Sequence, residues 1–258
     1  MISLTLEEKF KTLGVKPGDS ILVTSDILKF LINLKKNKIR FDLNDFIDLL
    51  LNKVGSKGNI LFPTFNWDFC KGKNFNYISS KSMTGSLSKI ALKRKDFKRS
   101  RNPIYSFAVA GKDQDLICSL KHKSCFGLDS PFGYLIKHKG KNLCIGMDYK
   151  DGFTFVHVAE ELVGVNYRYH KKYSGFNTYK KKKKLFETYQ MYVRDLSMKV
   201  ETKISAKLDK ILIKKKAYDK KLFYGTSLIL IDINTAYNTM VKDIKGKGHL
   251  VFPKKIKI

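Results

Sequence analysis

The chain has 258 residues, of which 43% are hydrophobic and 12% aromatic, and it carries 51 Lys and Arg against 23 Asp and Glu, a formal net charge of +28. This apolar content is typical of a globular protein with a large core and excludes a disordered chain. No apolar run approaches the roughly 18 residues that a membrane-spanning helix needs, and residues 1–5 lack the basic and apolar regions of a signal peptide. We therefore expect a cytoplasmic protein without a membrane span.

The first two thirds of the chain alternate between short apolar runs and segments with helical spacing. In chain order the expected elements are a helix from Thr5 to Gly14, a strand at 20–24, a helix after Asp42, a strand at 59–62, a helix after Thr84, a strand at 105–110, a short helix after Asp113, a helix opening at 131–135 and a strand at 142–147. This alternation predicts an α/β fold with a mostly parallel central sheet flanked by helices.

The residue pattern of the sequence changes beyond about residue 165. A lysine run, Lys180–Lys184, is expected in an exposed loop or at a hairpin edge, followed by a strand at 189–193, a helix at 204–213, a strand at 228–231 and a final short helix after Asn234. We expect a core over residues 1–165 and a smaller C-terminal lobe over residues 166–258, packed on the core as one compact unit.

The segment after the strand at 142–147 contains the strongest candidate for chemistry. A glycine turn leads into a helical segment in which Thr154, His157 and Glu160 are three residues apart and share one face. A carboxylate beside a histidine orients the ring, and a hydroxyl nearby can hold a reacting carbonyl, which suits proton abstraction. The alternative is a buried histidine with no catalytic role, on a helix that Thr154 caps.

Cysteine spacing argues against metal or disulfide chemistry. Cys70, Cys118, Cys125 and Cys144 form no Cys-x-x-Cys pair and no cluster with histidine at zinc spacing. We expect free thiols and no metal site. Cys125 lies in a polar loop, but the sequence shows no basic partner that would activate it as a nucleophile.

Six segments, in the same order, resemble the antibiotic N-acetyltransferase family, whose members include aminoglycoside 3-N-acetyltransferases. They are Gly14–Ser25, Gly58–Phe65 with its Pro-Thr-Phe ending, Met83–Leu87, Arg99–Phe107, the Ser-Pro-aromatic-Gly turn at Ser130–Gly133, and the Thr-x-x-His-x-Ala-Glu motif at Thr154–Glu160. The resemblance extends over about residues 5–175. Asn102 stands where the family usually has histidine, and Asp26 stands where a small apolar residue is common.

The resemblance implies direct transfer of an acetyl group from acetyl-CoA to an amine. His157 would take the proton of the amine, Glu160 would orient the ring, and Thr154 would donate to the developing oxyanion. The implied coenzyme A contacts are Thr24, Ser25, Thr64, Arg99, Ser106 and Phe107. For the acceptor we select Arg168 and Asp129. Arg168 could instead pair with a carboxylate at the lobe boundary, Arg99 could belong to a solvated charge run, and homo-oligomers are compatible with this scheme.

The basic composition bears on the acceptor. A cationic protein attracts anions, which favours a nucleotide-linked amino sugar used in surface polysaccharide synthesis over a polycationic aminoglycoside. The alternative is an aminoglycoside 3-N-acetyltransferase that confers antibiotic resistance. A nucleic-acid-binding protein is a further alternative, but no recognised binding motif is present, and a lysine bias shared with many Ile and Asn residues accounts for the charge. We expect a small-molecule acceptor and no nucleic acid.

Overall fold

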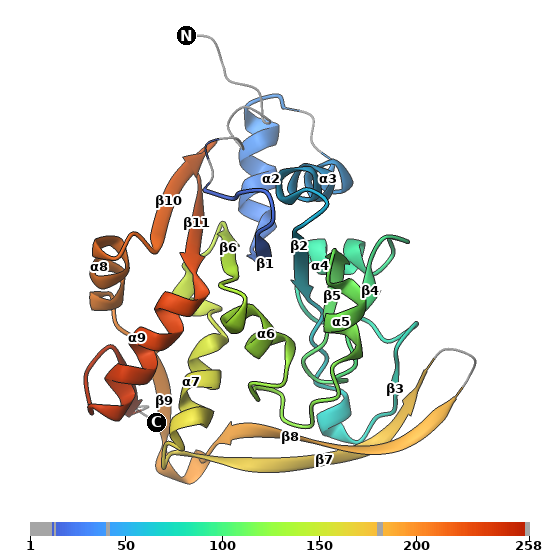
Figure 1. The fold of residues 1–258 in the computed structure, drawn as a ribbon, viewed down its shortest axis with the longest axis vertical. Helices are drawn as coiled ribbons and strands as arrows, with labels where there is room; N and C mark the ends of the chain where they lie inside the picture. The colour runs from blue at the N-terminus through green and yellow to red at the C-terminus, as the bar shows by residue number, and fades with distance from the viewer. Residues whose placement is uncertain (1–11, 13, 40–41, 180–182, 256–258) are drawn as a thin grey trace.

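The computed structural model describes residues 12, 14–39, 42–179 and 183–255. The predicted capping box at Thr5–Glu8 and part of the lysine run at Lys180–Lys184 lie outside these residues. Figure 1 shows a central sheet with helices on either side and a long hairpin that crosses below them. Within the described ranges, no helix has both the length and the apolar character that a membrane crossing requires.

The N-terminal part of the fold contains the elements up to the helix that carries His157. They are β1 (Ser20–Ser25), α2 (Ile27–Lys36), α3 (Leu43–Val54), β2 (Asn59–Pro63), η1 (Phe69–Lys71), β3 (Phe75–Asn76), α4 (Ser86–Ala91), β4 (Lys98–Arg99), β5 (Phe107–Gly111), α5 (Gln114–Ser119), α6 (Pro131–Lys137), β6 (Lys141–Ile145), η2 (Tyr149–Asp151) and α7 (Phe155–Val163). Capping follows ordinary side-chain chemistry: Asp42 accepts from the Asn44 amide at 2.6 Å, and Asp26 accepts from the Leu28 amide at 3.4 Å. The predicted cap Thr84 is wrong by one residue, because Gly85 precedes α4 and the Thr84 hydroxyl binds the Pro63 carbonyl.

The C-terminal part contributes a hairpin, two helices and two further strand pairs. Its elements are β7 (Arg168–Thr178), β8 (Lys184–Arg194), η4 (Leu196–Met198), β9 (Val200–Ile204), α8 (Lys207–Lys214), β10 (Tyr218–Phe223), β11 (Thr226–Asp232), α9 (Ile233–Lys245) and β12 (Val251–Lys255). β7 and β8 pair antiparallel along their whole length, and β3 adds to the edge of β7. β9 and β12 form a separate two-stranded sheet.

The central sheet has seven strands in the order β10-β11-β6-β1-β2-β5-β4. The α/β class with flanking helices is confirmed, but the predicted parallel pairing holds for only part of the sheet. Parallel pairing is limited to β6 with β1 and β1 with β2, while β5 is antiparallel to β2 and β11 is antiparallel to β6. In both cases the strand that precedes it in the chain, β4 or β10, runs in the direction of β1, and the chain then turns back into β5 or β11 beside it. Periodicity reports burial but not strand direction.

Two hydrophobic cores lie on the two faces of this sheet. Successive strand residues point to opposite faces, so Ile21 and Val23 enter one core while Leu22 enters the other. Residues of α2, α3 and α4 complete the first core, and residues of α5, α6, α7 and α9 complete the second. The second core therefore fixes α7, which carries His157, against the sheet.

Part of the C-terminal segment belongs to the central sheet and is not a separate lobe. β11 pairs with β6, and β10 pairs with β11, so both extend the central sheet. The hairpin β7–β8 and the pair β9–β12 lie outside that sheet (Figure 1). The assignment of residues 166–258 to the acceptor remains a prediction.

Candidate active site

The carboxyl ends of the three parallel strands supply the segments around the candidate site. Thr24 lies near the end of β1, Thr64 directly follows β2, and Thr154 lies after β6 and η2. Because parallel strands end at the same edge of a sheet, these segments meet at the position where α/β proteins usually bind ligands. The segments that carry Thr24, Thr64 and Thr154 therefore lie at one edge of the sheet.

α7 places His157 and Glu160 on one face, as their spacing requires. The helix is anchored by the fully buried Phe155 and Ala159, and Gly164 ends it with φ of 70°. Thr154 precedes the first helical residue, but its side chain makes no capping hydrogen bond. Thr154 therefore occupies the N-cap position, as the alternative expected, but it does not cap the helix through its hydroxyl.

Glu160 is the centre of a buried hydrogen-bond network. Its Oε2 lies 2.8 Å from His157 Nδ1, and its Oε1 accepts from the Tyr167 hydroxyl at 2.9 Å. The Thr202 hydroxyl also donates to Oε1. Arg168 Nε lies 2.8 Å from Oε2 as an ion pair, although its N–H does not point along a hydrogen bond to that oxygen. The Glu160 side chain is completely inaccessible to solvent, while 28% of the His157 side chain is exposed.

These contacts set the protonation states of the pair. Burial lowers the pKa of His157, the charge of Arg168 lowers it further, and the hydrogen bond with Glu160 offsets only part of the effect. Burial alone would raise the pKa of Glu160, but the hydrogen bond with His157 and the charge of Arg168 bring it below its ordinary value. Glu160 is thus ionised and accepts the Nδ1 proton, which leaves the Nε2 lone pair of a neutral His157 for a substrate.

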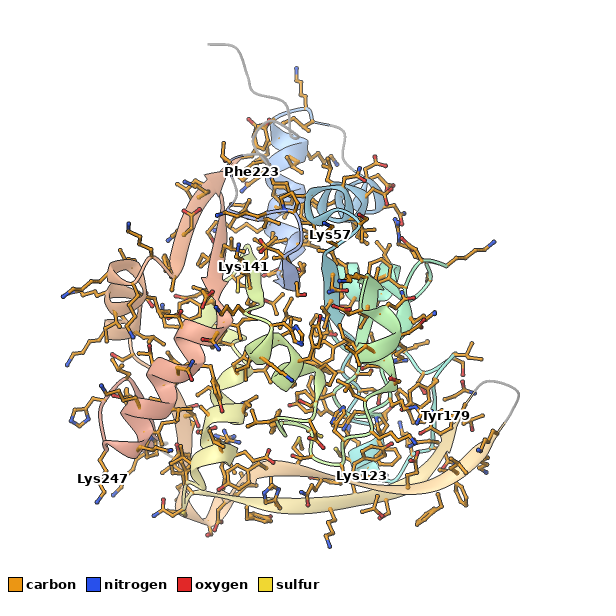
Figure 2. All side chains as sticks on the ribbon, viewed as in Figure 1. Lys57, Lys123, Lys141, Tyr179, Phe223 and Lys247 are labelled. Atoms are coloured by element: carbon orange, nitrogen blue, oxygen red, sulfur yellow. The ribbon has the colours of Figure 1, made fainter. Side chains whose placement is uncertain are left out.

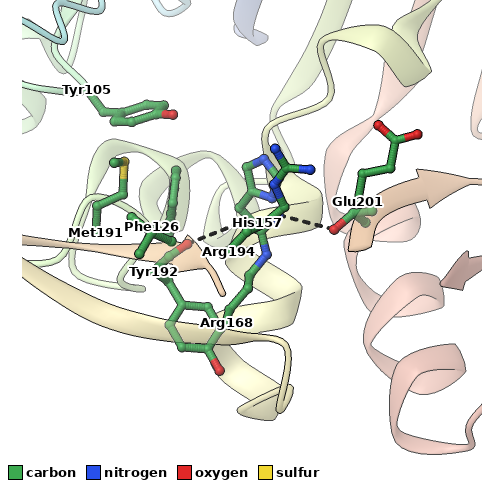
Figure 3. A pocket seen from close by; sticks show the side chains of 10 residues that line it. Tyr105, Phe126, His157, Arg168, Met191, Tyr192, Arg194 and Glu201 are labelled. Atoms are coloured by element: carbon green, nitrogen blue, oxygen red, sulfur yellow. Dashed lines mark hydrogen bonds between the residues drawn. The ribbon is translucent and has the colours of Figure 1, made fainter. Parts of the chain in front are cut away.

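A cavity of about 430 Å³ opens beside His157. Figure 3 shows Tyr105 and Phe126 on one side of it and Arg168, Arg194 and Glu201 on the other. The Phe126 ring lies 5.3 Å from the His157 ring, measured between centroids, and limits the movement of the imidazole. The cavity is in the size range of small-ligand pockets.

Arg168 is an internal residue of the site. Its side chain is 7% exposed, its Nη1 donates to the Tyr192 carbonyl at 3.1 Å, and its Nη2 donates to the Thr202 hydroxyl at 3.1 Å. With Glu160 beside Nε, all three guanidinium nitrogens are engaged by the protein. The structure therefore favours the alternative in which Arg168 pairs with a carboxylate over an open fork that binds the phosphates of an acceptor.

The predicted coenzyme A residues fall into two groups. Thr24 accepts from Asn142 Nδ2 at 3.1 Å and donates to Cys144 Sγ at 3.2 Å, so its hydroxyl is bound to β6. Ser25 is half-buried, and its hydroxyl has no hydrogen-bond partner among residues 14–39, 42–179 and 183–255. These two residues lie at the carboxyl edge, where their role toward a cofactor remains a prediction.

The second group is a buried unit behind that edge. Arg99 donates to the Ser106 hydroxyl and to the Thr64 carbonyl, each at 2.9 Å, and its guanidinium carbon lies 4.6 Å from the Phe75 ring centroid. Burial lowers the pKa of Arg99 to about 10. Ser106 and Thr64 share a hydrogen bond of 2.8 Å, and Phe107 is fully buried. These side chains hold β2 and β5 together; cofactor contacts for them remain predictions.

Asp129 is separated from the His157 cavity. It is exposed and lines a different hollow, beside α6 and α9, with Ser130, His138 and Tyr237. The next residue, Ser130, caps α6 by accepting from the Phe132 amide. An acceptor contact by Asp129 therefore has no geometric support.

Several residues of the site were not identified from the sequence. Tyr167 and Thr202 bind Glu160 directly, and Tyr105 and Phe126 line the cavity. Tyr105 lies within the matched segment Arg99–Phe107, which offered a signal. Thr202 offered none, because 42 residues separate it from Glu160 in the sequence.

The burial of the cysteines affects their reactivity. Cys125 is completely buried, and burial raises the pKa of its thiol well above the ordinary value, which disfavours the reactive thiolate. All four cysteines have free thiols. In the part of the chain that the structure describes, no group of three His, Cys, Asp or Glu side chains could hold a metal ion.

The fold and the site describe a mixed α/β protein with a histidine–carboxylate pair at the carboxyl edge of its sheet. Comparison with known proteins identifies its family. The sequence model for aminoglycoside 3-N-acetyltransferases matches residues 34–245. This chain therefore belongs to the aminoglycoside 3-N-acetyltransferase family.

Individual relatives have low sequence identity to this chain. The SPbeta prophage-derived aminoglycoside N(3')-acetyltransferase-like protein YokD of Bacillus subtilis (strain 168) is 26% identical over 180 residues, which cover 60% of this chain and 63% of that protein, less than two thirds of its length. Sisomicin-bound AAC-VIa is similar in structure with a TM-score of 0.76, 17% identity and coverage of 94% of this chain and 97% of that one. AAC-IIIb in a binary complex with CoASH gives a TM-score of 0.75, 16% identity and coverage of 94% and 95%.

Proposed function

We propose that this protein is an acetyl-CoA-dependent N-acetyltransferase that acetylates an amine of an aminoglycoside-type acceptor by direct transfer. The observation that carries the proposal is the pair formed by a neutral His157 and an ionised, fully buried Glu160 beside an open cavity. Membership of the aminoglycoside 3-N-acetyltransferase family supports the reaction class. The structural similarity to a protein in complex with CoASH supports acetyl-CoA as the donor.

In the proposed reaction, His157 is the general base. Its Nε2 takes a proton from the acceptor nitrogen as that nitrogen attacks the thioester carbonyl carbon, and the carbon–sulfur bond breaks to release the coenzyme A thiol. The proton that His157 gained can pass to the leaving sulfur, so the cycle balances. Glu160 stabilises the imidazolium that forms between these steps, because its carboxylate lies 2.8 Å from Nδ1.

The residues around the sheet edge fit a thioester cofactor. The Ser25 hydroxyl is available at the end of β1, and the Thr154 side chain is not used in capping. We assign to Ser25 and Thr24 the binding of the cofactor chain and to Thr154 a hydrogen bond to the oxyanion. Bound acetyl-CoA supplies the activated acyl group, and the residues of this chain orient it and move the proton.

The acceptor assignment rests on the comparisons. Aminoglycoside-modifying relatives favour an aminoglycoside-type amine over the nucleotide-linked amino sugar that the charge first suggested. Arg168, which was selected to bind such a diphosphate, is paired with Glu160. Glu201, which lines the cavity with 38% of its side chain exposed, is a carboxylate that could contact a cationic amino sugar.

The test is acetyl transfer to a panel of aminoglycosides and nucleotide-linked amino sugars, followed by mass spectrometry, with wild type and two variants. His157→Asn should lower kcat by roughly a hundredfold or more while acetyl-CoA binding stays near normal, because it removes only the base. Glu160→Gln should lower kcat less, because it keeps the shape and removes the charge.

Two results would count against this proposal. Near-normal turnover by His157→Asn would remove His157 from the mechanism. Transfer to a nucleotide-linked amino sugar, with none to any aminoglycoside, would overturn the acceptor assignment and leave the reaction class intact.

A further inference from the structure

The long hairpin of β7 and β8 has two faces with different surroundings. Its strands pair in register, so Phe176 lies opposite Phe186, and Ser174 lies opposite Thr188 with their hydroxyls 2.8 Å apart. Figure 1 shows the hairpin at the border of the molecule. Because successive residues of a strand point to opposite faces, every second residue of β7 and β8 shares a face.

One face of the hairpin packs on the body of the protein. A Cβ atom added at Gly175 would lie 2.9 Å from the Phe69 ring on η1, and the centroid of that ring lies 5.9 Å from the centroid of the Tyr189 ring. Gly175 and Tyr189 are both buried. The residues directly before and after them on each strand therefore point away from the body.

The opposite face, which we call the outer face, is both aromatic and basic. It consists of exposed residues only, namely Lys172, Ser174, Phe176, Lys184, Phe186 and Thr188. The Phe186 side chain is 64% exposed and that of Phe176 is 40% exposed. Figure 2 labels Lys123 and Tyr179 on the body side of the hairpin and shows other side chains projecting from its far side. Two neighbouring exposed phenylalanine rings form an apolar patch, which is typical of an interaction surface.

The outer face has no negative charge that balances its lysines. None of its six residues is acidic, and within the described ranges neither Lys172 nor Lys184 forms an ion pair. Glu187 points to the body side, where its carboxylate accepts from Asn177 Nδ2 at 2.8 Å. Lys184 Nζ lies 4.3 Å from the centre of the Phe176 ring, which holds this cation beside the aromatic pair. A partner of the outer face must accept apolar rings and supply negative charge.

We propose that the outer face docks on a lipid surface that contains anionic headgroups. The Phe176 and Phe186 rings enter between the headgroups, and the ammonium groups of Lys172 and Lys184 contact lipid phosphates. Burial of apolar area and attraction of lysines to anionic lipids are the two contributions that hold peripheral proteins on membranes. This inference goes beyond the proposed acetyl transfer and does not depend on it.

Two other partners fit the outer face less well. A second copy of this chain would bring like charges together, because a symmetric contact places the same lysines opposite each other. Single-stranded nucleic acid binds through bases that stack on open ring faces. Lys184 lies over the Phe176 ring, and the Phe176 and Phe186 ring planes meet at 71° with centroids 5.2 Å apart, so the two rings form no flat platform for bases.

The hairpin also connects the outer face to the candidate active site. Met191 lines the His157 cavity and lies on β8 with Phe186, about 17 Å further along the strand. A protein docked through the outer face therefore keeps the cavity near the lipid surface, where the negative potential concentrates cations. On the proposed function, this surface would offset the repulsion between the net charge of +28 and a cationic acceptor.

The experiment is co-sedimentation of the protein with vesicles at about 0.15 M salt. Vesicles of phosphatidylcholine with about one third phosphatidylglycerol should bind the protein saturably, and vesicles of phosphatidylcholine alone should not. Phe176→Thr, Phe186→Thr should weaken binding by at least about tenfold, because the apolar area of two rings is lost while strand propensity is kept. The matched control, Leu28→Thr, Leu222→Thr, removes two exposed apolar side chains on α2 and β10, far from the hairpin in Figure 1, and should change binding less than about twofold.

The contribution of charge is measured with a second pair of double variants. Lys172→Gln, Lys184→Gln should weaken binding to the anionic vesicles by at least about tenfold, because each lysine beside such a surface contributes roughly fivefold. Lys210→Gln, Lys214→Gln on α8 removes the same net charge at exposed positions away from the hairpin and should weaken binding less than about threefold. All four double variants should melt like wild type by circular dichroism, because the replaced side chains are exposed.

Fluorescence reports whether a ring enters the lipid. The chain has one tryptophan, Trp67, which lies outside the hairpin. The emission of Phe186→Trp should shift to shorter wavelength when anionic vesicles are added, because the added indole enters an apolar environment, and the emission of wild type should not shift.

Three results would overturn the proposal. The first is the absence of saturable binding to the anionic vesicles. The second is an equal loss of binding in the hairpin variants and in their controls, because the attraction is then only that of the net charge. The third is binding to a single-stranded oligonucleotide that the outer-face variants lose, without vesicle binding, which would assign the face to nucleic acid. Acetyl transfer is not part of these readouts, so failure here and failure of the proposed activity are distinguishable.

Discussion

At the residue scale, the candidate site depends on one buried carboxylate with four partners. His157, Tyr167, Arg168 and Thr202 come from α7, the turn after it, β7 and β9, and all four contact Glu160. A buried charge is costly unless it is paired and hydrogen-bonded, so this network is what allows an ionised carboxylate beneath the base. Of the two cations that lower the pKa of His157, Arg168 has the larger effect, and its charge also lowers the pKa of Glu160.

Arg168 therefore has a testable effect on the pH dependence. Arg168 lowers the pKa of His157 because a nearby positive charge disfavours the imidazolium. Arg168→Met should raise that pKa, and the acid limb of kcat/KM should move to higher pH. The measurement is a pH profile with one acceptor, so that titration of the acceptor amine is common to all variants.

Two further variants control this prediction. Arg194→Met removes a cation that lines the same cavity and also lowers the pKa of His157, but with less effect than Arg168, so its limb should move less in the same direction. Glu160→Gln removes the group that raises the pKa of His157, and its limb should move to lower pH. Identical profiles for wild type and Arg168→Met would show that Arg168 is only a structural partner.

At the scale of elements, α6 supports the position of α7. Phe132 on α6 packs edge-on against Phe155 on α7 with ring centroids 5.3 Å apart, and it also contacts Phe126 beside His157. Gly133 allows the Leu128 backbone to pack against α6, since a Cβ atom at that position would lie 1.9 Å from the Leu128 carbonyl oxygen. The Ser-Pro-aromatic-Gly turn thus serves to pack α6 next to the candidate site.

A substitution in α6 tests this role. Gly133→Ala should lower the free energy of unfolding by about 2–4 kcal/mol, because the clash is with backbone and forces the helix to move. The control Gly55→Ala, at the end of α3, has a φ of 64° but no atom within 4 Å of the added Cβ, and should cost only about 1 kcal/mol. Chemical denaturation measures the free energy of unfolding of both variants. Equal losses would show that the clash with Leu128 does not add to the cost of the substitution.

At the scale of the whole molecule, the net charge of +28 acts on every charged ligand. An aminoglycoside is repelled and acetyl-CoA is attracted, and added salt screens both effects. The KM for the aminoglycoside should therefore fall, and the KM for acetyl-CoA should rise, as the salt concentration increases. Steady-state kinetics at about 50 and 300 mM salt, which span the range where the Debye length shortens appreciably, measure both. Movement of both KM values in the same direction would argue against control by the overall field.

The sequence by itself determined much about this protein because local patterns carry that information. Many strand and helix positions follow from periodicity and caps, although α2, β7 and β10 were not expected. The pairing of His157 with Glu160 follows from helical spacing. The family resemblance over about residues 5–175 agrees with the family model, which matches residues 34–245.

Only the tertiary structure decided which distant residues share a site. Strand direction depended on the edge to which each connection returned, so the antiparallel β5 and β11 were not visible in their own residues. The contacts of Tyr167 and Thr202 with Glu160, the engagement of Arg168 and the separate hollow that Asp129 lines followed from the packing of β7, β9 and α6 around α7. These contacts join residues far apart in sequence, where no local periodicity specifies which side chains meet.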